Sequence, residues 1–236
     1  GYAVKHECER GYCKPRKSDR GQKALPSERR YKHEPVVERH IPDRNAYLCD
    51  TEDKLIPAIE GLVETFRRLE KENEGVVKSG RTHLQDATPI AFSQEISGWR
   101  SSLERDIELL KLASAPLCTL ALGGTAVGTG LNAPKGFAEL VAKKAAMLTG
   151  KPFVTGENKF HCLTSKDELV FAHGAIKATA CDMMKIANDV RWLASGPRDG
   201  LGEIHIPENE PGSSIMPGKV NPTQCEAVTM VAVQVM

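Results

Sequence analysis

The chain has 236 residues, of which 40% are hydrophobic and 27% charged, and its formal net charge is +1. This composition is typical of a soluble globular protein with one or two domains. The near-zero charge gives no support for nucleic acid or a membrane surface as a partner, and no apolar run reaches the roughly 18 residues that a spanning helix needs.

The seven cysteines of the chain are odd in number and follow no regular spacing. Such a set speaks against a disulfide framework and in favour of reduced thiols. The first residues also lack the apolar core of a secretory signal peptide. We therefore expect a cytoplasmic protein.

Residues 1–49 differ in composition from the rest of the chain. They are rich in Lys, Arg, Glu and Pro and show almost no apolar periodicity. Such a segment cannot bury enough apolar surface to offset the entropy that it loses on ordering. We therefore predict an irregular or disordered segment over residues 1–49 and a helical domain over residues 50–236.

From Asp50 the apolar residues recur at steps of three and four, which predicts an amphipathic helix that ends near Gly75. Residues 80–87 then predict a loop that carries Thr82 and His83. Thr88 suits the N-cap of a second helix with Pro89 at its first position, and Pro116 ends that helix.

The glycine-rich residues 123–132 predict tight turns and close packing rather than a phosphate cradle, because no strand leads into them. Residues 137–148 form a shorter helix that Gly150 stops. Ser165 and Glu168 form a capping box that opens a long helix to about Leu193. Since no alternating strand pattern emerges, the predicted fold class is all-α.

The stretch with the most chemistry is residues 212–226, Gly-Ser-Ser-Ile-Met-Pro-Gly-Lys-Val-Asn-Pro-Thr-Gln-Cys-Glu. It predicts a mobile loop that leads into a helix, because Asn221 suits the N-cap, Pro222 the first helical position and Gln224 a capping box. A nucleotide-binding loop is excluded, because five residues separate Gly212 from Gly218, whereas four separate the two glycines of that motif.

Residues 222–236 are almost wholly apolar, which is typical of a helix buried in a multi-helix or multi-subunit core. Glu226 on that helix needs a partner, because a buried unpaired carboxylate is costly. The helix N-terminus, the cation of Lys219 and the loop hydroxyls therefore predict an anion site with a candidate base beside it.

Residues 212–226 resemble the signature of the fumarase/aspartase superfamily, and the tail Thr-Gln-Cys-Glu at 223–226 has its fumarase form. Residues 80–89, 123–132 and 185–193 are similar to class II fumarases in particular. The resemblance covers about residue 51 to 236. It implies the long-helix bundle of the superfamily's central domain, in a homotetramer whose sites are shared between subunits.

The same resemblance implies the reversible hydration of fumarate to (S)-malate by anti addition of water, in the tricarboxylic acid cycle. No metal and no cofactor would be needed, and a eukaryotic source would imply mitochondria. Two alternatives are a catalytically silent fragment and a related lyase of the superfamily, such as aspartate ammonia-lyase.

The resemblance also implies roles for single residues. Ser213 would take the carbon-bound proton, and Ser214 would contact the substrate. Lys219 and Asn221 would bind its carboxylate. Thr82 and His83 would serve the side on which the hydroxyl leaves, with Glu226 orienting His83; a buried carboxylate raises the basicity of a neighbouring imidazole.

Two substrate-binding segments of the fumarases are missing from residues 1–49. Codons that encode residues 1–49 can be chosen so that a reading frame shifted by one nucleotide encodes both missing segments. The two segments then appear in the order in which the fumarases have them. Residues 1–49 are therefore predicted to be a frameshifted translation, and the chain a fragment that also lacks the family's C-terminal part. The gene sequence decides this hypothesis.

Overall fold

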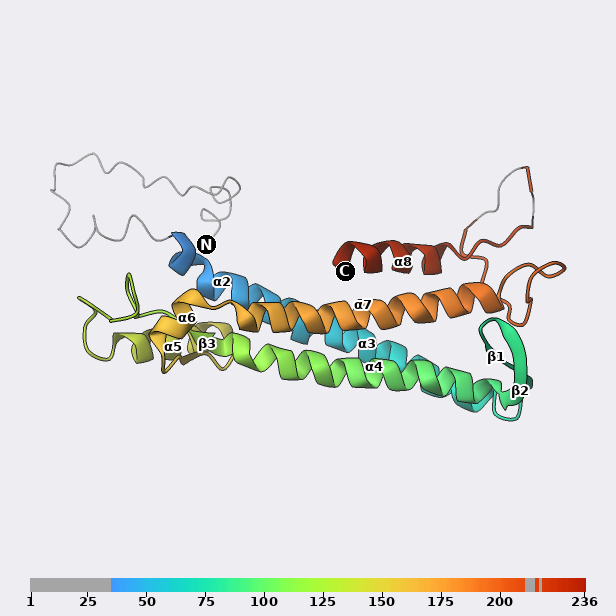
Figure 1. Cartoon of the computed structure of the whole chain (residues 1–236), viewed down its shortest axis with the longest axis horizontal. Helices are drawn as coiled ribbons and strands as arrows, with labels where there is room; N and C mark the ends of the chain where they lie inside the picture. Colours follow the sequence, from blue (N-terminus) through green and yellow to red (C-terminus); the bar gives the residue numbers. More distant parts are fainter. Residues whose placement is uncertain (1–34, 211–214, 217) are drawn as a thin grey trace. The chain divides into compact units, whose positions relative to one another are not determined.

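The computed structural model describes residues 35–210, 215, 216 and 218–236. Arg39–Met236 form one compact unit. This unit is built mainly from helices, with two short pairs of strands (Figure 1). The predicted all-α class is thereby confirmed.

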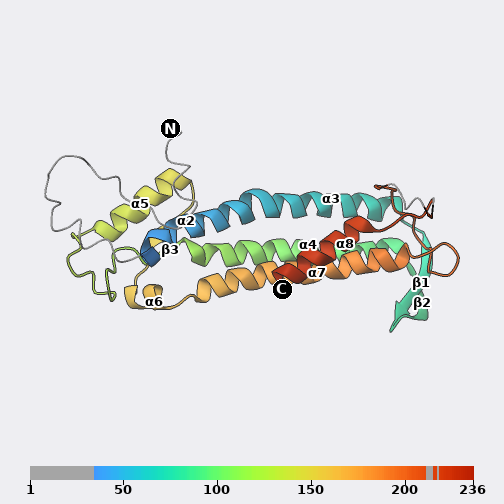
Figure 2. The same ribbon diagram turned by 90° about the horizontal axis from the view of Figure 1, so that it is seen from above.

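Three long helices form the centre of this unit: α3 (Ile56–Glu72), α4 (Phe92–Ser114) and α7 (Asp167–Leu193). Helix α4 lies against both α3 and α7 (Figure 2). Each helix has an apolar stripe at the three- and four-residue steps that place side chains on one face. On α3 this buried stripe consists of Ile56, Ile59, Val63 and Phe66.

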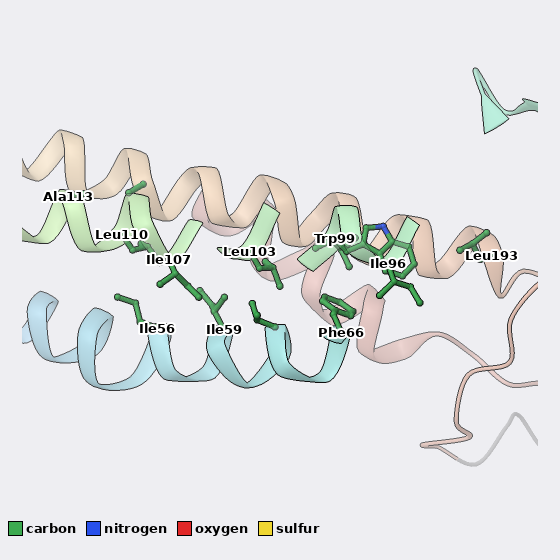
Figure 3. Packing of buried hydrophobic residues seen from close by; sticks show 13 residues of the cluster. Ile56, Ile59, Phe66, Ile96, Trp99, Leu103, Ile107, Leu110, Ala113 and Leu193 are labelled. Carbon is green, nitrogen blue, oxygen red and sulfur yellow. The ribbon is translucent and has the colours of Figure 1, made fainter. Parts of the chain in front are cut away.

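The core between these helices is a continuous cluster of buried apolar side chains (Figure 3). The Trp99 ring belongs to this cluster, with its centroid 5.9 Å from that of Phe66 and 6.3 Å from that of Phe92. Its indole N–H donates a hydrogen bond to Asp189 at 2.9 Å, so this large side chain is buried with its polar atom satisfied. The buried stripe of α3 is the one that the apolar spacing from Asp50 predicted.

Two predicted helix boundaries are close to those observed. Helix α5 (Phe137–Thr149) ends at Gly150, whose φ of 72° suits a glycine C-cap. Helix α7 ends at Leu193, as predicted. The predicted capping box at its start is wrong: the Ser165 hydroxyl instead accepts the N–H of Asp167 at 3.3 Å.

A β-hairpin replaces the predicted loop over residues 80–87 and the predicted helix start at Thr88. Strand β1 (Val77–Thr82) pairs antiparallel with β2 (Gln85–Ala91), and α4 begins only at Phe92. Most of the hairpin is exposed, so it has no alternation of apolar and polar residues from which to predict strands. Pro89 is tolerated because an edge strand does not need every N–H.

The prediction of an irregular segment up to residue 49 is wrong for residues 35–49, which are helical. Helix α2 (Pro35–Asp50) continues through the π-helical turn η2 (Thr51–Leu55) into α3. Leu48 is fully buried, and buried Arg44 pairs with Glu168 and donates to the Leu117 carbonyl at 3.0 Å. These tertiary contacts stabilise the helix. It therefore forms although its sequence has little apolar periodicity. Residues 1–34 lie outside the described residues.

The remaining elements lie around the start of α7. They are the 3-10 helix η3 (Ala115–Cys118), the parallel pair β3 (Thr119–Leu120) and β4 (Val154–Thr155), and helix α6 (Lys159–Thr164). The glycine-rich stretch packs closely here, as predicted. A Cβ on Gly128, with φ of 98°, would lie 2.8 Å from the Phe160 ring.

Helix α8 (Thr223–Val235) runs back along α7 (Figure 1). The predicted capping box at its start is wrong, since Pro222 is the N-cap and no side chain caps the helix. Ala232 is its buried residue, whereas Met230, Val231 and Val233 are 62% to 67% exposed. The apolar face that the sequence assigns to a core is therefore uncovered in the single chain. No described helix is long and apolar enough to cross a membrane.

Candidate functional site

A pocket of about 510 Å³ lies where the C-terminal end of α7 meets the start of α8. It brings together three residues that the sequence predicted for the site: Lys219, Asn221 and Glu226. The other lining residues come from the last turns of α7, from the chain that follows α7 and from the chain before α8: Asn188, Arg191, Trp192, Ala194, Ser195, Gly196, Val220 and Pro222.

One side of the pocket is formed by the segment that leads into α8. Lys219 is exposed and makes no ion pair with any described residue. The first backbone N–H groups of α8 follow directly, and their partial positive charge favours an anion. The cation of Lys219, the amide of Asn221 and the helix start thus lie at one pocket; that they bind an anion stays a prediction.

The acidic side of the pocket is Glu226, in the first turn of α8. Its carboxylate oxygen lies 3.7 Å from the Arg191 guanidinium of α7. A second guanidinium nitrogen of Arg191 donates to Asn188 Oδ1 at 3.1 Å. Sequence reasoning missed Arg191 and Asn188 as site residues, although they lie one helical turn apart in the stretch 185–193 that resembles the fumarases.

Cys225, next to Glu226, is suited to packing rather than to nucleophilic chemistry. Burial raises the pKa of its thiol; the charge of Arg191 opposes this to a smaller extent, and that of Glu226 adds to it. Less of the reactive thiolate is therefore present near neutral pH than in an exposed cysteine.

Thr82 and His83 lie outside this pocket. They are exposed at the turn of the β1–β2 hairpin, where His83 has a φ of 54°. In the described part of the chain no hydrogen bond or ion pair joins His83 to Glu226. The predicted pairing of these two side chains is thus not made within one chain, and it stays a prediction for an assembly of several chains. Ser213 and Ser214 lie outside the described residues.

The β1–β2 hairpin lies beside the end of α7 (Figures 1 and 2). An ion-pair cluster holds it there. Glu203 accepts from Arg81 at 2.5 Å and from Lys78 at 3.0 Å, and Lys78 also pairs with Glu95 at 2.6 Å. The hydrogen bond from Arg81, and then that from Lys78, hold the pKa of Glu203 below its ordinary value against the opposing effect of burial. The Glu203 N–H donates to the Leu193 carbonyl at 2.8 Å, which ties the cluster to α7.

Residues 44–236 match the protein family described as Lyase, and the chain belongs to that family. The match begins several residues before the predicted start of the domain, in agreement with the packed helix that contains Arg44. The family assignment agrees with the long-helix fold.

Within this family the chain is most informatively compared with class II fumarate hydratases. It is 63% identical over 187 residues to the enzyme of Staphylococcus saprophyticus and 60% identical over 184 residues to that of Bacillus subtilis. These matches cover 79% and 78% of this chain but 41% and 40% of the relatives. The chain thus spans about two fifths of the length of the relatives that it matches.

Two solved structures have the same fold. The class II fumarase of Schistosoma mansoni is 41% identical with a TM-score of 0.74, over 82% of this chain and 44% of that one. The cobalt-bound fumarate lyase:delta crystallin of Brucella melitensis is 38% identical with a TM-score of 0.79, over 83% and 42%.

Proposed function

We propose that this chain is the central part of a class II fumarate hydratase, which converts fumarate reversibly to (S)-malate by anti addition of water. The observation that carries the proposal is the pocket in which Lys219, Asn221 and Glu226 meet at the start of α8. The identity of 60% to 63% to class II fumarate hydratases supports it. The enzyme would act in the tricarboxylic acid cycle, in the cytoplasm or, in a eukaryote, in mitochondria.

The reaction sets a clear demand on the site. Dehydration of malate removes a proton from a carbon next to a carboxylate, and that carbon is a very weak acid. The carboxylate then carries a second negative charge, which preorganised donors must stabilise. Lys219, the amide of Asn221 and the first N–H groups of α8 are the donors suited to this charge.

In this mechanism Ser213 removes the carbon-bound proton, and Ser214 contacts the substrate. A serine hydroxyl is a weak base in water, so its alkoxide needs an electropositive site from which water is excluded. The position of Ser213, six residues before Lys219 in the chain, lets both serve one substrate.

His83 and Thr82 handle the hydroxyl that leaves as water. In a tetramer His83 of one copy would meet Glu226 of another, and that carboxylate would fix the tautomer and raise the basicity of the imidazole. The exposed apolar face of α8 supports an association of copies, because contiguous apolar surface of this kind is rare on monomers.

The proposal is tested with a chimera in which residues 44–236 replace the aligned stretch of the Bacillus subtilis enzyme. The chimera should form tetramers and produce fumarate from malate, as measured by ultraviolet absorbance. The 236-residue chain by itself is expected to show little or no turnover. A tetrameric chimera that releases ammonia from aspartate, or that is inert, would contradict the proposal.

A further inference from the structure

Arg191 is held at the edge of the pocket in a way that leaves its guanidinium available. It lies in the last turn of α7, and its side chain is 38% exposed. Asn188 orients it through a hydrogen bond of 3.1 Å. The distance of 3.7 Å to Glu226 is longer than a hydrogen-bonded ion pair requires. Since a guanidinium has five N–H donors, most are not engaged by the described residues.

The pocket has cations on two of its sides. Lys219 belongs to the segment before α8, whereas Arg191 comes from α7. Among the described lining residues Glu226 is the one acid, so the two cations leave a net charge of +1 when it is ionised. An excess of positive charge divided between two elements suits a ligand with two separate anionic groups better than one with a single anionic group.

We propose that Arg191 is a second anion-binding residue of this pocket and makes it selective for dicarboxylates over monocarboxylates. Lys219 holds one carboxylate, and the planar fork of Arg191 receives the other by paired N–H donors. This inference rests on the proposed function and adds to it the residue that recognises the far end of the substrate.

A competing role for Arg191 is to neutralise Glu226. The two roles differ in a double-substitution experiment. If Arg191 contacts the ligand, Arg191→Gln weakens dicarboxylate binding by the same factor in the natural chain and in a Glu226→Gln background. If Arg191 only neutralises Glu226, Arg191→Gln does not change the dicarboxylate affinity in the Glu226→Gln background.

The binding experiment uses the 236-residue chain with succinate, an unreactive dicarboxylate, and propionate, its monocarboxylate counterpart. The indole N–H signal of Trp192 in nuclear magnetic resonance reports on occupancy, because Trp192 lines the pocket and Trp99 is the other of the two tryptophans. Arg68→Gln is the matched control, because Arg68 pairs with Glu72 on the exposed side of α3 and its loss removes the same charge.

We expect Arg191→Gln to weaken succinate binding about ten- to hundredfold and propionate binding less than about threefold. Arg68→Gln should change neither affinity. An Arg191→Gln chain that binds succinate as tightly as the natural chain would overturn the inference, and so would a natural chain that does not bind succinate. Turnover of fumarate by the chimera is measured separately, so an inert chimera refutes the proposed function without altering the selectivity for succinate.

Discussion

Replacing Asp106 by asparagine should remove a pH dependence from the stability of the helix bundle. Asp106 lies on α4 with 2% of its surface exposed, and its Oδ2 atom has no hydrogen-bond partner among the described residues. An ionised carboxylate in this buried position would be costly, because no cation among the described residues pairs with it. An asparagine side chain has nearly the same shape and cannot ionise.

The magnitude follows from the pKa. Burial, and to a smaller extent the charge of Asp182 on α7, raise the pKa of Asp106 from its ordinary value of 3.8 to about 7. Between these two values the folded chain holds a proton that the unfolded chain has released. The free energy of unfolding therefore falls as the pH rises, by about 1.4 kcal/mol per pH unit and by at most about 4 kcal/mol in total.

The assay is urea denaturation of the natural chain and of Asp106→Asn at several pH values from about 4 to 8. At the lowest pH the two should differ by about 1 kcal/mol or less, and above pH 7 the variant should be the more stable by up to about 4 kcal/mol. Other titrating groups cancel in the difference. Glu108→Gln, an exposed substitution on the same helix, should show no such trend. A difference that stays constant over this range would refute the reasoning.

Three further substitutions test the proposed catalytic base, the ion-pair cluster at the hairpin and the exposed apolar face of α8. In the chimera Ser213→Ala should keep the tetramer and lower turnover about 10²–10⁴-fold; turnover like that of the parent would remove Ser213 from its role. Glu203→Gln leaves Lys78 and Arg81 without their shared carboxylate, which should cost about 1–3 kcal/mol. In this variant, hydrogen exchange of the backbone amides of residues 77–91 should accelerate while that of α3 stays slow. Unchanged exchange in the hairpin would contradict the role of the ion-pair cluster in holding it. Val231→Lys breaks the exposed apolar face of α8 and should lower light scattering by the 236-residue chain at unchanged helix content; equal scattering would show that another surface drives association.

The family and the main helices could be predicted from the sequence. Apolar residues at helical spacing fix which face of α3, α4 and α7 is buried, because that pattern belongs to the chain itself. The stretch 212–226 likewise marks the start of α8 as the candidate site, since a cation followed by a helix start is a local arrangement. These features need no knowledge of distant contacts.

Other features depend on contacts between residues far apart in the chain, and only the tertiary structure decided them. The hairpin of residues 77–91 is exposed and polar, so its strands leave no apolar alternation, and ion pairs to Glu203 hold it in place. The helix around Arg44 depends on Glu168, which lies 124 residues away.

The composition of the pocket also depends on the tertiary structure. Arg191 lies 28 positions before Lys219 in the sequence, and its place in the stretch 185–193 does not show that it faces Lys219. The packing of α8 along α7 brings the two cations to one pocket and leaves Glu226 beside Arg191. The same packing leaves the apolar side of α8 exposed. The sequence by itself thus determined the helices and the side of the pocket that contains Lys219 and Asn221. The contact between α7 and α8 decided that Arg191 lines the same pocket.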